Sequence, residues 1–322
     1  MQNDKSKLKI VFLGTSEFGA IVLEGLIKGN YKPILVVTAS DKPVGRKQLL
    51  TPSPVKVIAQ KYDIPVLQPD RIVNCKLKTV GLKPDLAIVS AYGQIIPKDM
   101  LDIPKSGFIN VHPSLLPKYR GPSPIQAAIL NGDQETGVTI ILVDEKMDHG
   151  PIIKSSKLKV QSSKFTYREL HNKLAELGAK LLLETIPKWT KGEIKPTPQD
   201  ESKATYTKIL KKEDGKIDWE KSAKELERQV RAFSPWPGSY AFWQMPKGPL
   251  TRIKILKVRV FIFPLSKTYS IGKTLIVPQN EIGVQCGKDF LVIEKLQMEG
   301  GKAMGSEEFV RGRPDFIGTI LK

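Results

Sequence analysis

The feature that most constrains the fold of this 322-residue chain is an alternation of short apolar runs with helical segments. The runs have the length and the β-branched content of buried strands. Strands of this kind, separated by helices, predict an α/β fold whose Rossmann-like, mostly parallel sheet is covered by helices on both faces. The expected strands lie at residues 9–13, 34–37, 86–90, 107–111, 138–143 and 152–158, and the expected helices at 17–28, 53–62, 123–132 and 166–188.

The composition changes after residue 190, which indicates a second domain. Residues 191–214 are rich in Lys, Pro, Thr and Asp and show little apolar periodicity, so we predict a linker there. A helix is expected next, followed by several short strands. We therefore predict an α/β domain over residues 1–190 and an OB-like β-barrel over residues 215–322. The helix is expected at 222–232 and the strands at 239–243, 251–263, 273–277, 282–285 and 290–297.

The chain is strongly basic, with 51 Lys and Arg against 33 Asp and Glu and a formal net charge of +18. Between Arg228 and Asn280 there are nine basic residues and no acidic one. A basic stretch without carboxylates is typical of proteins that bind a polyanion such as nucleic acid. Because Lys far outnumbers Arg, a codon bias that enriches surface lysine remains the alternative explanation.

Cysteine usage and hydropathy indicate a cytoplasmic protein. Cys75 and Cys286 lie far apart without neighbouring His or Cys, so we expect reduced thiols and neither a disulfide nor a zinc site. No apolar run reaches the roughly 18 residues that a membrane helix needs, and the polar N-terminus does not read as a secretory signal. We expect a monomer that binds no membrane and no metal.

Three polar residues near strand ends are candidates for catalysis. Asn110 and His112 are two apart on one expected strand, so their side chains share a face. Asp148 follows the 138–143 strand in a turn before Gly150. Open parallel sheets bind ligands at the carboxyl ends of their strands, where such a trio can hold an oxyanion and move a proton. The alternatives are loop hydrogen bonding without catalysis, and His149 as the base.

The turn at residues 14–19, GTSEFG, resembles a dinucleotide fingerprint but lacks its middle glycine. That glycine allows the backbone to approach a pyrophosphate closely, so we expect a structural turn and not a nucleotide site.

Motifs around the polar trio resemble those of the 10-formyltetrahydrofolate-dependent formyltransferases. Residues 112–117 read HPSLLP, 119–121 read YRG, 91–97 read AYGQIIP, and Asp148 is followed by Gly150, Pro151 and Ile152. The resemblance spans residues 8 to 320 and is strongest to the members that act on methionyl-tRNA. It rests also on the basic loop at residues 41–56 and on RAFSPWPG at 231–238.

The resemblance implies 10-formyltetrahydrofolate as formyl donor, no metal, and initiator methionyl-tRNA as acceptor. Asn110, His112 and Asp148 would be the catalytic residues. The folate would contact a loop after the 86–90 strand and the residues that follow His112. The implied folate-binding residues are Tyr92, Gly93, Ile95, Ile96, Pro97, Ser114, Leu115, Leu116 and Pro117.

The tRNA would be bound by the basic loop and by the C-terminal barrel. Lys257 and Arg259 are two apart and should share one face of a strand, with Lys254 on the other face. The loop is less basic than expected of the family, which leaves open how many phosphates it contacts. The expected tRNA-binding residues are Arg46, Lys47, Arg231, Lys254, Lys257 and Arg259.

Two other functions remain open at this point. The same chemistry on an amino-sugar nucleotide needs neither the basic loop nor the net charge. A non-catalytic RNA-binding protein on the same fold would have no need of an intact Asn110, His112 and Asp148 set.

Overall fold

The computed structural model describes residues 8–45, 47–72, 82–160, 165–246, 248–262 and 269–322. Its contacts divide the chain into two compact units. The N-terminal unit comprises Met1–Pro124, Gln134–Gln161 and Glu169–Lys208, and the C-terminal unit comprises Ile125–Asp133, Ser162–Arg168 and Ile209–Lys322.

The N-terminal unit is built on a seven-stranded sheet in the order β5-β2-β1-β6-β7-β8-β9. The five strands from β5 to β7 are parallel, whereas β8 and β9 are antiparallel to their neighbours. The mostly parallel sheet is thus confirmed. The strands are β1 (Ile10–Gly14), β2 (Leu35–Val37), β5 (Val66–Leu67), β6 (Leu86–Ser90), β7 (Phe108–His112), β8 (Glu135–Leu142) and β9 (Ile152–Lys159).

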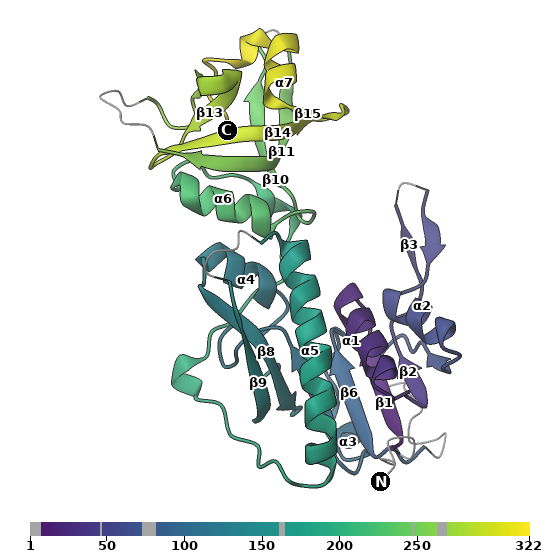
Figure 1. Ribbon diagram of the computed structural model, residues 1–322. Helices are drawn as coiled ribbons and strands as arrows, with labels where there is room; N and C mark the ends of the chain where they lie inside the picture. Colours follow the sequence, from purple (N-terminus) through teal and green to yellow (C-terminus); the bar gives the residue numbers. More distant parts are fainter. Residues whose placement is uncertain (1–7, 46, 73–81, 161–164, 247, 263–268) are drawn as a thin grey trace. The chain divides into compact units, whose positions relative to one another are not determined.

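The two faces of this sheet are covered differently. Helices α1 (Glu17–Lys28) and α5 (Tyr167–Thr190) lie side by side on one face (Figure 1). They approach so closely that a Cβ on Gly25 would lie 2.6 Å from that of Ala179. Helix α2 (Pro54–Lys61) packs against α1.

On its opposite face the sheet packs against the segment after β6, which includes the short helix α3 (Lys98–Leu101). Residues of β1, β6 and β7 form an apolar cluster here with the segment after β6. The cluster includes Val11, Leu13, Ala87, Val89, Phe108, Tyr92, Ile96 and Met100.

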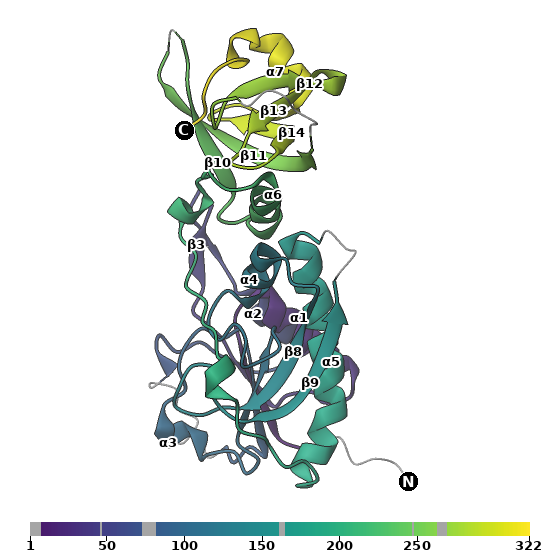
Figure 2. The same ribbon diagram turned by 90° about the vertical axis from the view of Figure 1, so that its left-hand side faces the viewer.

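A two-stranded hairpin of β3 (Lys42–Val44) and β4 (Leu49–Thr51) projects from the N-terminal unit (Figure 2). All six strand residues are exposed, including Val44, Leu49 and Leu50. At its base Lys56 Nζ lies 2.7 and 2.9 Å from the two carboxylate oxygens of Asp41.

The C-terminal unit contains an antiparallel sheet in the order β10-β11-β14-β13-β12, with β15 paired to β14. Helix α6 lies across one end of this sheet and α7 at the other (Figures 1 and 2). Short helix α4 (Pro124–Asn131) also falls in this unit. The remaining elements are α6 (Ala223–Ala232), β10 (Ser239–Gln244), β11 (Leu250–Phe261), β12 (Thr274–Val277), β13 (Glu281–Gln285), β14 (Phe290–Met298), β15 (Ala303–Gly305) and α7 (Ser306–Gly312).

Both edges of the C-terminal sheet are joined through the last residues of the chain. The backbones of Phe242 in β10 and Lys322 exchange two hydrogen bonds of 2.7 and 2.9 Å. On the other edge, the Thr274 N–H donates to Thr319. The core inside contains Trp243, Phe309 and Phe316 in edge-to-face contact, all 3% exposed or less.

The segment expected to be a linker, residues 191–214, is not a free connector along its length. Up to Lys208 it belongs to the N-terminal unit. Thr197 exchanges backbone hydrogen bonds of 2.7 and 2.8 Å with Ile152, and the Thr207 N–H donates to the Arg120 carbonyl at 2.8 Å. Within the segment lie two short 3-10 helices, Glu201–Lys203 and Lys212–Gly215.

Candidate active site

Strand β7 brings Asn110 and His112 to the sheet face that the long helices leave uncovered. Val111, between them, points the other way, because a Cβ added to Gly178 of α5 would lie 2.8 Å from it. Because side chains alternate between the two faces of a strand, Phe108, Asn110 and His112 all point to the face opposite α5. The expectation that Asn110 and His112 share a face is confirmed by their contacts with the same carboxylate.

That carboxylate belongs to Asp148. Its Oδ1 lies 3.1 Å from Nδ2 of Asn110 and 3.4 Å from Nδ1 of His112. The three side chains thus converge as predicted, but for a different reason. Because β8 is antiparallel to β7, its end at Leu142 lies beside Ile109, and the loop from Val143 to Gly150 brings Asp148 back along β7.

The His112 ring is held as a donor on both sides. Its Nε2 lies 3.0 Å from the carbonyl oxygen of Tyr119, which only accepts, so Nε2 carries a proton. Its Nδ1 faces the Asp148 carboxylate. Burial by itself lowers the pKa of His112, but the charge of Asp148 and the hydrogen bonds to Asp148 and Tyr119 outweigh it and raise the pKa above 6.5. These interactions therefore favour the charged imidazolium form of His112.

Asp148 stays ionised although it is largely buried. Burial raises the pKa of its carboxyl, but the His112 charge and hydrogen bond, the Gly121 N–H and the charge of Arg120 outweigh it and lower the pKa below 3.8. The Gly121 N–H donates to Oδ2 at 2.8 Å. The site thus combines an amide donor, an imidazole whose charged form is favoured, and a carboxylate, which suits the stabilisation of an oxyanion and the removal of a proton.

The other two histidines are engaged elsewhere. His149 Nδ1 lies 2.5 Å from Oδ2 of Asp144, and its Nε2 lies 3.5 Å from Glu201. His171 is buried in α5 with its ring edge-on to Phe18. The geometry therefore favours His112 over His149 as the partner of Asp148.

The loop of residues 91–97, which is expected to contact the folate, begins at the carboxyl end of β6, the parallel neighbour of β7. Its side chains alternate in exposure: Tyr92 and Ile96 are buried, whereas Ile95 is 60% exposed. Gly93 has a φ of 82° and nothing within 4 Å of an added Cβ. Pro97 precedes α3 and is half-buried.

The residues after His112 form a tight turn beside β8. The hydroxyl of Ser114 donates to the Lys118 carbonyl at 2.6 Å, and the Leu116 N–H donates to the Thr139 hydroxyl at 3.1 Å. Leu116 is buried, whereas Leu115 and Pro117 are half-buried. These contacts hold the stretch that leads from His112 to Tyr119.

Comparison with known families identifies the chain. Residues 8–186 match the family model described as formyl transferase, and residues 209–314 match the formyl transferase C-terminal domain. The methionyl-tRNA formyltransferase of Citrifermentans bemidjiense is 42% identical over 95% of this chain and 93% of its own. That of Bacillus velezensis is 43% identical over 97% of each. The chain belongs to the methionyl-tRNA formyltransferase family.

Solved structures share the fold of this formyltransferase at low sequence identity. HypX from Aquifex aeolicus, in complex with tetrahydrofolic acid, has a TM-score of 0.62 at 18% identity, with 95% of this chain and 47% of HypX covered. An N-formyltransferase from Helicobacter canadensis, in complex with folinic acid and dTDP-3-aminofucose, has a TM-score of 0.62 at 20% identity. The match covers 89% of this chain and 98% of that enzyme.

The expected tRNA-binding residues of this formyltransferase fall in two places. Lys47 is exposed beside β4, and Arg46 lies outside the described residues. Arg231 is engaged within the C-terminal unit, because its guanidinium bonds both carboxylate oxygens of Glu227 and the Phe165 carbonyl.

Strand β11 presents its basic residues differently from the expectation. Its pairing with β14 shifts register around Lys257, which reverses the alternation of faces along the strand. Ile253 and Ile255 face the core before the shift and Val258 after it. Lys254, Lys257 and Arg259 therefore all lie on the outer face, and the expected opposite orientation of Lys254 is wrong.

Carboxylates from neighbouring strands accompany these cations. Lys257 Nζ lies 2.7 Å from Glu294 of β14, and Arg259 pairs with Glu281 of β13. The stretch from Arg228 to Asn280 contains no acidic residue, but acidic residues from outside it lie next to its cations in the folded protein. Pairing across a sheet depends on register, which the stretch itself does not encode.

The turn between β1 and α1 serves packing. A Cβ at Gly14 or Gly19 would lie 2.8 or 2.6 Å from the carbonyl oxygen of Ser90. The glycines thus allow the close approach of β6, as expected of a structural turn.

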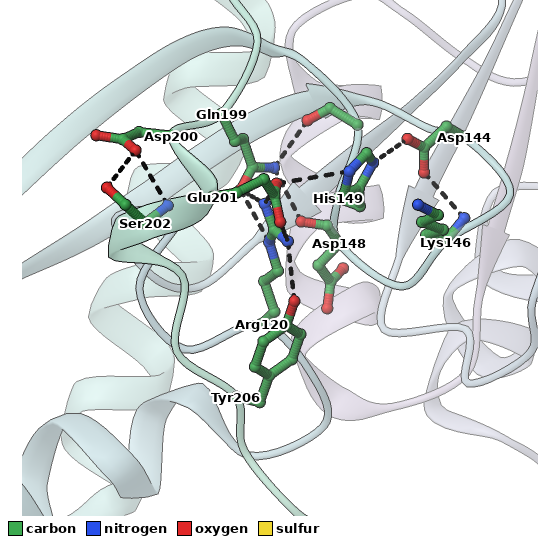
Figure 3. A network of polar contacts seen from close by, with 11 residues as sticks. Arg120, Asp144, Lys146, Asp148, His149, Gln199, Asp200, Glu201, Ser202 and Tyr206 are labelled. Atoms are coloured by element: carbon green, nitrogen blue, oxygen red, sulfur yellow. Dashed lines mark hydrogen bonds and ion pairs between the residues drawn. The ribbon is translucent and has the colours of Figure 1, made fainter.

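Sequence reasoning missed the residues that surround Asp148. Figure 3 shows Arg120, which is 1% exposed, held between Gln199, Glu201 and Tyr206. In the sequence Arg120 stands out only as part of the YRG motif, and nothing in the Pro-rich segment around Gln199 indicates contact with the site. Among the described residues, no group of three or more His, Cys, Asp or Glu can hold a metal, and no helix is long and apolar enough to cross a membrane.

Proposed function

We propose that this protein transfers the formyl group of 10-formyltetrahydrofolate to the α-amino group of initiator methionyl-tRNA. The observation that carries the proposal is the convergence of Asn110, His112 and Asp148 on one face of β7. The family membership supplies the acceptor and the donor, and the geometry supplies a site able to perform the transfer.

In the proposed reaction the amine attacks the formyl carbon, and negative charge develops on the formyl oxygen. Asn110 uses one amide proton on Asp148 and donates the other to this oxygen. The positive charge of His112 stabilises the same oxygen. Asp148, which is ionised at neutral pH because its pKa is lowered, accepts through water the proton that the amine loses. The bond between the formyl carbon and N10 of the folate then breaks, and the proton is passed on to N10, so that tetrahydrofolate leaves.

The folate is proposed to bind between the loop of residues 92–97 and the turn of residues 114–117. Exposed Ile95 offers an apolar surface for a flat ring, and the open backbone at Gly93 allows close approach. Leu115 and Pro117 are half-buried at the edge of this region.

For the tRNA, we propose two binding surfaces on a monomeric protein. The hairpin β3–β4, with Lys47 and Arg46, reaches the acceptor end. The C-terminal unit, interpreted as an OB-like barrel, binds phosphates through Lys254, Lys257 and Arg259 on its outer face. Arg231 is the weakest candidate in this set, since its guanidinium is already bound by Glu227.

One assay tests the proposal. The purified protein is given 10-formyltetrahydrofolate together with charged initiator tRNA, charged elongator tRNA or an amino-sugar nucleotide. Formylation of the initiator alone is expected. Formylation of the sugar nucleotide, or of no acceptor, would overturn the proposal, and Asp148→Ala serves as the inactive control.

A further inference from the structure

The segment from Thr197 to Lys208 lies along two loops of the active site. At its start, Thr197 pairs with Ile152, just after the loop that carries Asp148. At its end, Tyr206 pairs with Arg120, in the loop that follows His112. A single stretch of chain thus connects both loops that build the site.

Between these two anchor points, Gln199 bonds to both loops. Its Nε2 donates to the carbonyl oxygens of Asp148 and Gly150 at 2.9 and 2.8 Å. Its Oε1 accepts from Nε and a terminal nitrogen of Arg120 at 3.1 and 2.9 Å. The guanidinium only donates and the two carbonyls only accept, so the orientation of the Gln199 amide is fixed by its surroundings.

Arg120 transmits this contact to the carboxylate. The residue after it, Gly121, donates its backbone N–H to Oδ2 of Asp148. Arg120 itself is buried, and Glu201 holds its guanidinium by two hydrogen bonds of 2.6 and 3.0 Å. Gln199 therefore contacts both segments that determine where the Asp148 carboxylate lies: the one with the Gly121 N–H donor and the turn that contains Asp148 itself.

Asp148 needs such support. Its φ is 49°, in the left-handed region that is unfavourable for a non-glycine residue. A conformation of this kind persists only when the surrounding contacts hold it in place. Gln199 bonds the carbonyls on both sides of His149 and so fixes the turn in which Asp148 adopts this conformation.

We propose that Gln199 is a positioning residue for formyl transfer: it holds the Asp148 carboxylate against Asn110 and His112, with Arg120 and Glu201 fixing Gln199 in turn. This inference rests on the proposed function of the same site. In the pair of His112 and Asp148, each group shifts the pKa of the other, and the charge of Arg120 also lowers the pKa of Asp148. Loss of Gln199 is expected to displace Asp148. The displacement weakens the interaction between Asp148 and His112, so the pKa of His112 should fall.

The test compares Gln199→Met, which removes both polar groups at similar length, with Gln199→Glu, which still accepts from Arg120 but donates to neither carbonyl. Asp200→Ala is the matched control, because the exposed Asp200 side chain bonds Ser202 and pairs with Lys203 in the same segment. Formylation kinetics are measured across pH. The His112 pKa is followed by NMR of the imidazole protons, which come from only three histidines.

Both Gln199 variants are expected to lower kcat about 100-fold with KM near the wild-type value, as for a small misplacement of a catalytic group. In Gln199→Met, which adds no charge, the His112 pKa and the matching limb of the pH profile should move to lower pH, whereas Asp200→Ala should change neither. A wild-type kcat in both variants, or an unchanged His112 pKa in Gln199→Met, overturns the inference. The NMR titration does not depend on catalysis, so it also gives the His112 pKa of a variant whose activity is too low for kinetics. If the wild-type protein formylates no tRNA, the proposed function fails instead.

Discussion

Two strands of this protein carry paired charges, and they differ in what surrounds the pairs. On β7 the His112 imidazolium faces Asp148, with side chains 5% and 13% exposed. On β11 the Lys257 ammonium faces Glu294 with a side chain 73% exposed. In the first case the charges lie in a weakly screened interior, and in the second they lie in water and salt.

The difference shows how a pair of a basic side chain and a carboxylate can serve two roles. The buried pair is fixed by the Tyr119 carbonyl, the Gly121 N–H and Asn110, so its protonation is set by the fold. The exposed pair is free to exchange its carboxylate for another anion at little cost. Burial thus favours a reactive site on β7, whereas exposure favours reversible binding of a polyanion on β11.

The largest effect should come from breaking the buried site. Asn110→Ala removes a proposed donor to the oxyanion and is expected to lower kcat about 100–1000-fold. Steady-state formylation of initiator methionyl-tRNA measures it, with circular dichroism to verify folding. A well-folded Asn110→Ala protein with wild-type turnover would remove Asn110 from the mechanism. His112→Ala and Asp148→Ala should show losses of the same order.

The pH dependence of stability sharpens the contrast. The pKa of His112 is raised, so its contribution is complete below 6.5 and is lost as pH rises through the folded-state pKa. The pKa of Asp148 is lowered, so its contribution is complete above 3.8 and is lost as pH falls through the folded-state pKa. The pair therefore stabilises the fold most between pH 3.8 and 6.5.

Asp148→Asn tests this window. We expect it to lower the free energy of unfolding by about 1.5–3 kcal/mol within the window, as for a hydrogen bond to a charged group. The loss should shrink towards alkaline and strongly acidic pH. Urea unfolding of both proteins across pH measures the difference, and a difference that does not vary with pH would contradict the assigned charges.

Sequence alone predicts much of the site, but not the strand direction and the course of the loop that bring its residues together. Asn110 and His112 were predictable because a strand has a strict period of two. The prediction that Asp148 joins the site rests on a parallel sheet, yet β8 is antiparallel and its following loop returns along β7. Strand direction depends on connections and packing far from the motif, which no local pattern encodes.

The same limit explains the other errors. A register shift in β11 places Lys257 and Arg259 on the same outer face as Lys254, and carboxylates of β13 and β14 pair with cations of a stretch that is free of acids in sequence. The segment around Gln199 has the composition of a linker, but its backbone hydrogen bonds are made to distant residues. Local composition cannot reveal partners that lie about 50 to 80 residues away.

A smaller effect is expected from altering the exposed pairs. If β11 binds tRNA phosphates, Glu294→Gln should tighten tRNA binding a few-fold at low salt, because Lys257 is freed. Lys257→Glu combined with Arg259→Glu should weaken binding and flatten its dependence on salt, since each phosphate contact contributes about 0.7–0.9 to the logarithmic slope. Filter binding at several salt concentrations measures both, and unchanged slopes would remove β11 from the binding surface.

The smallest effect on stability should come from the hairpin. Leu49 and Leu50 are 64% and 69% exposed, so their replacement by Ser should change the free energy of unfolding by less than about 0.5 kcal/mol. Leu291→Ala, at a fully buried position of β14, should by contrast cost about 2–5 kcal/mol. Exposed apolar side chains on a projecting hairpin are typical of a binding surface, so the leucine variant should raise KM for tRNA while KM for the folate stays the same. A rise in both KM values would place the hairpin's influence at the catalytic site instead of at the tRNA.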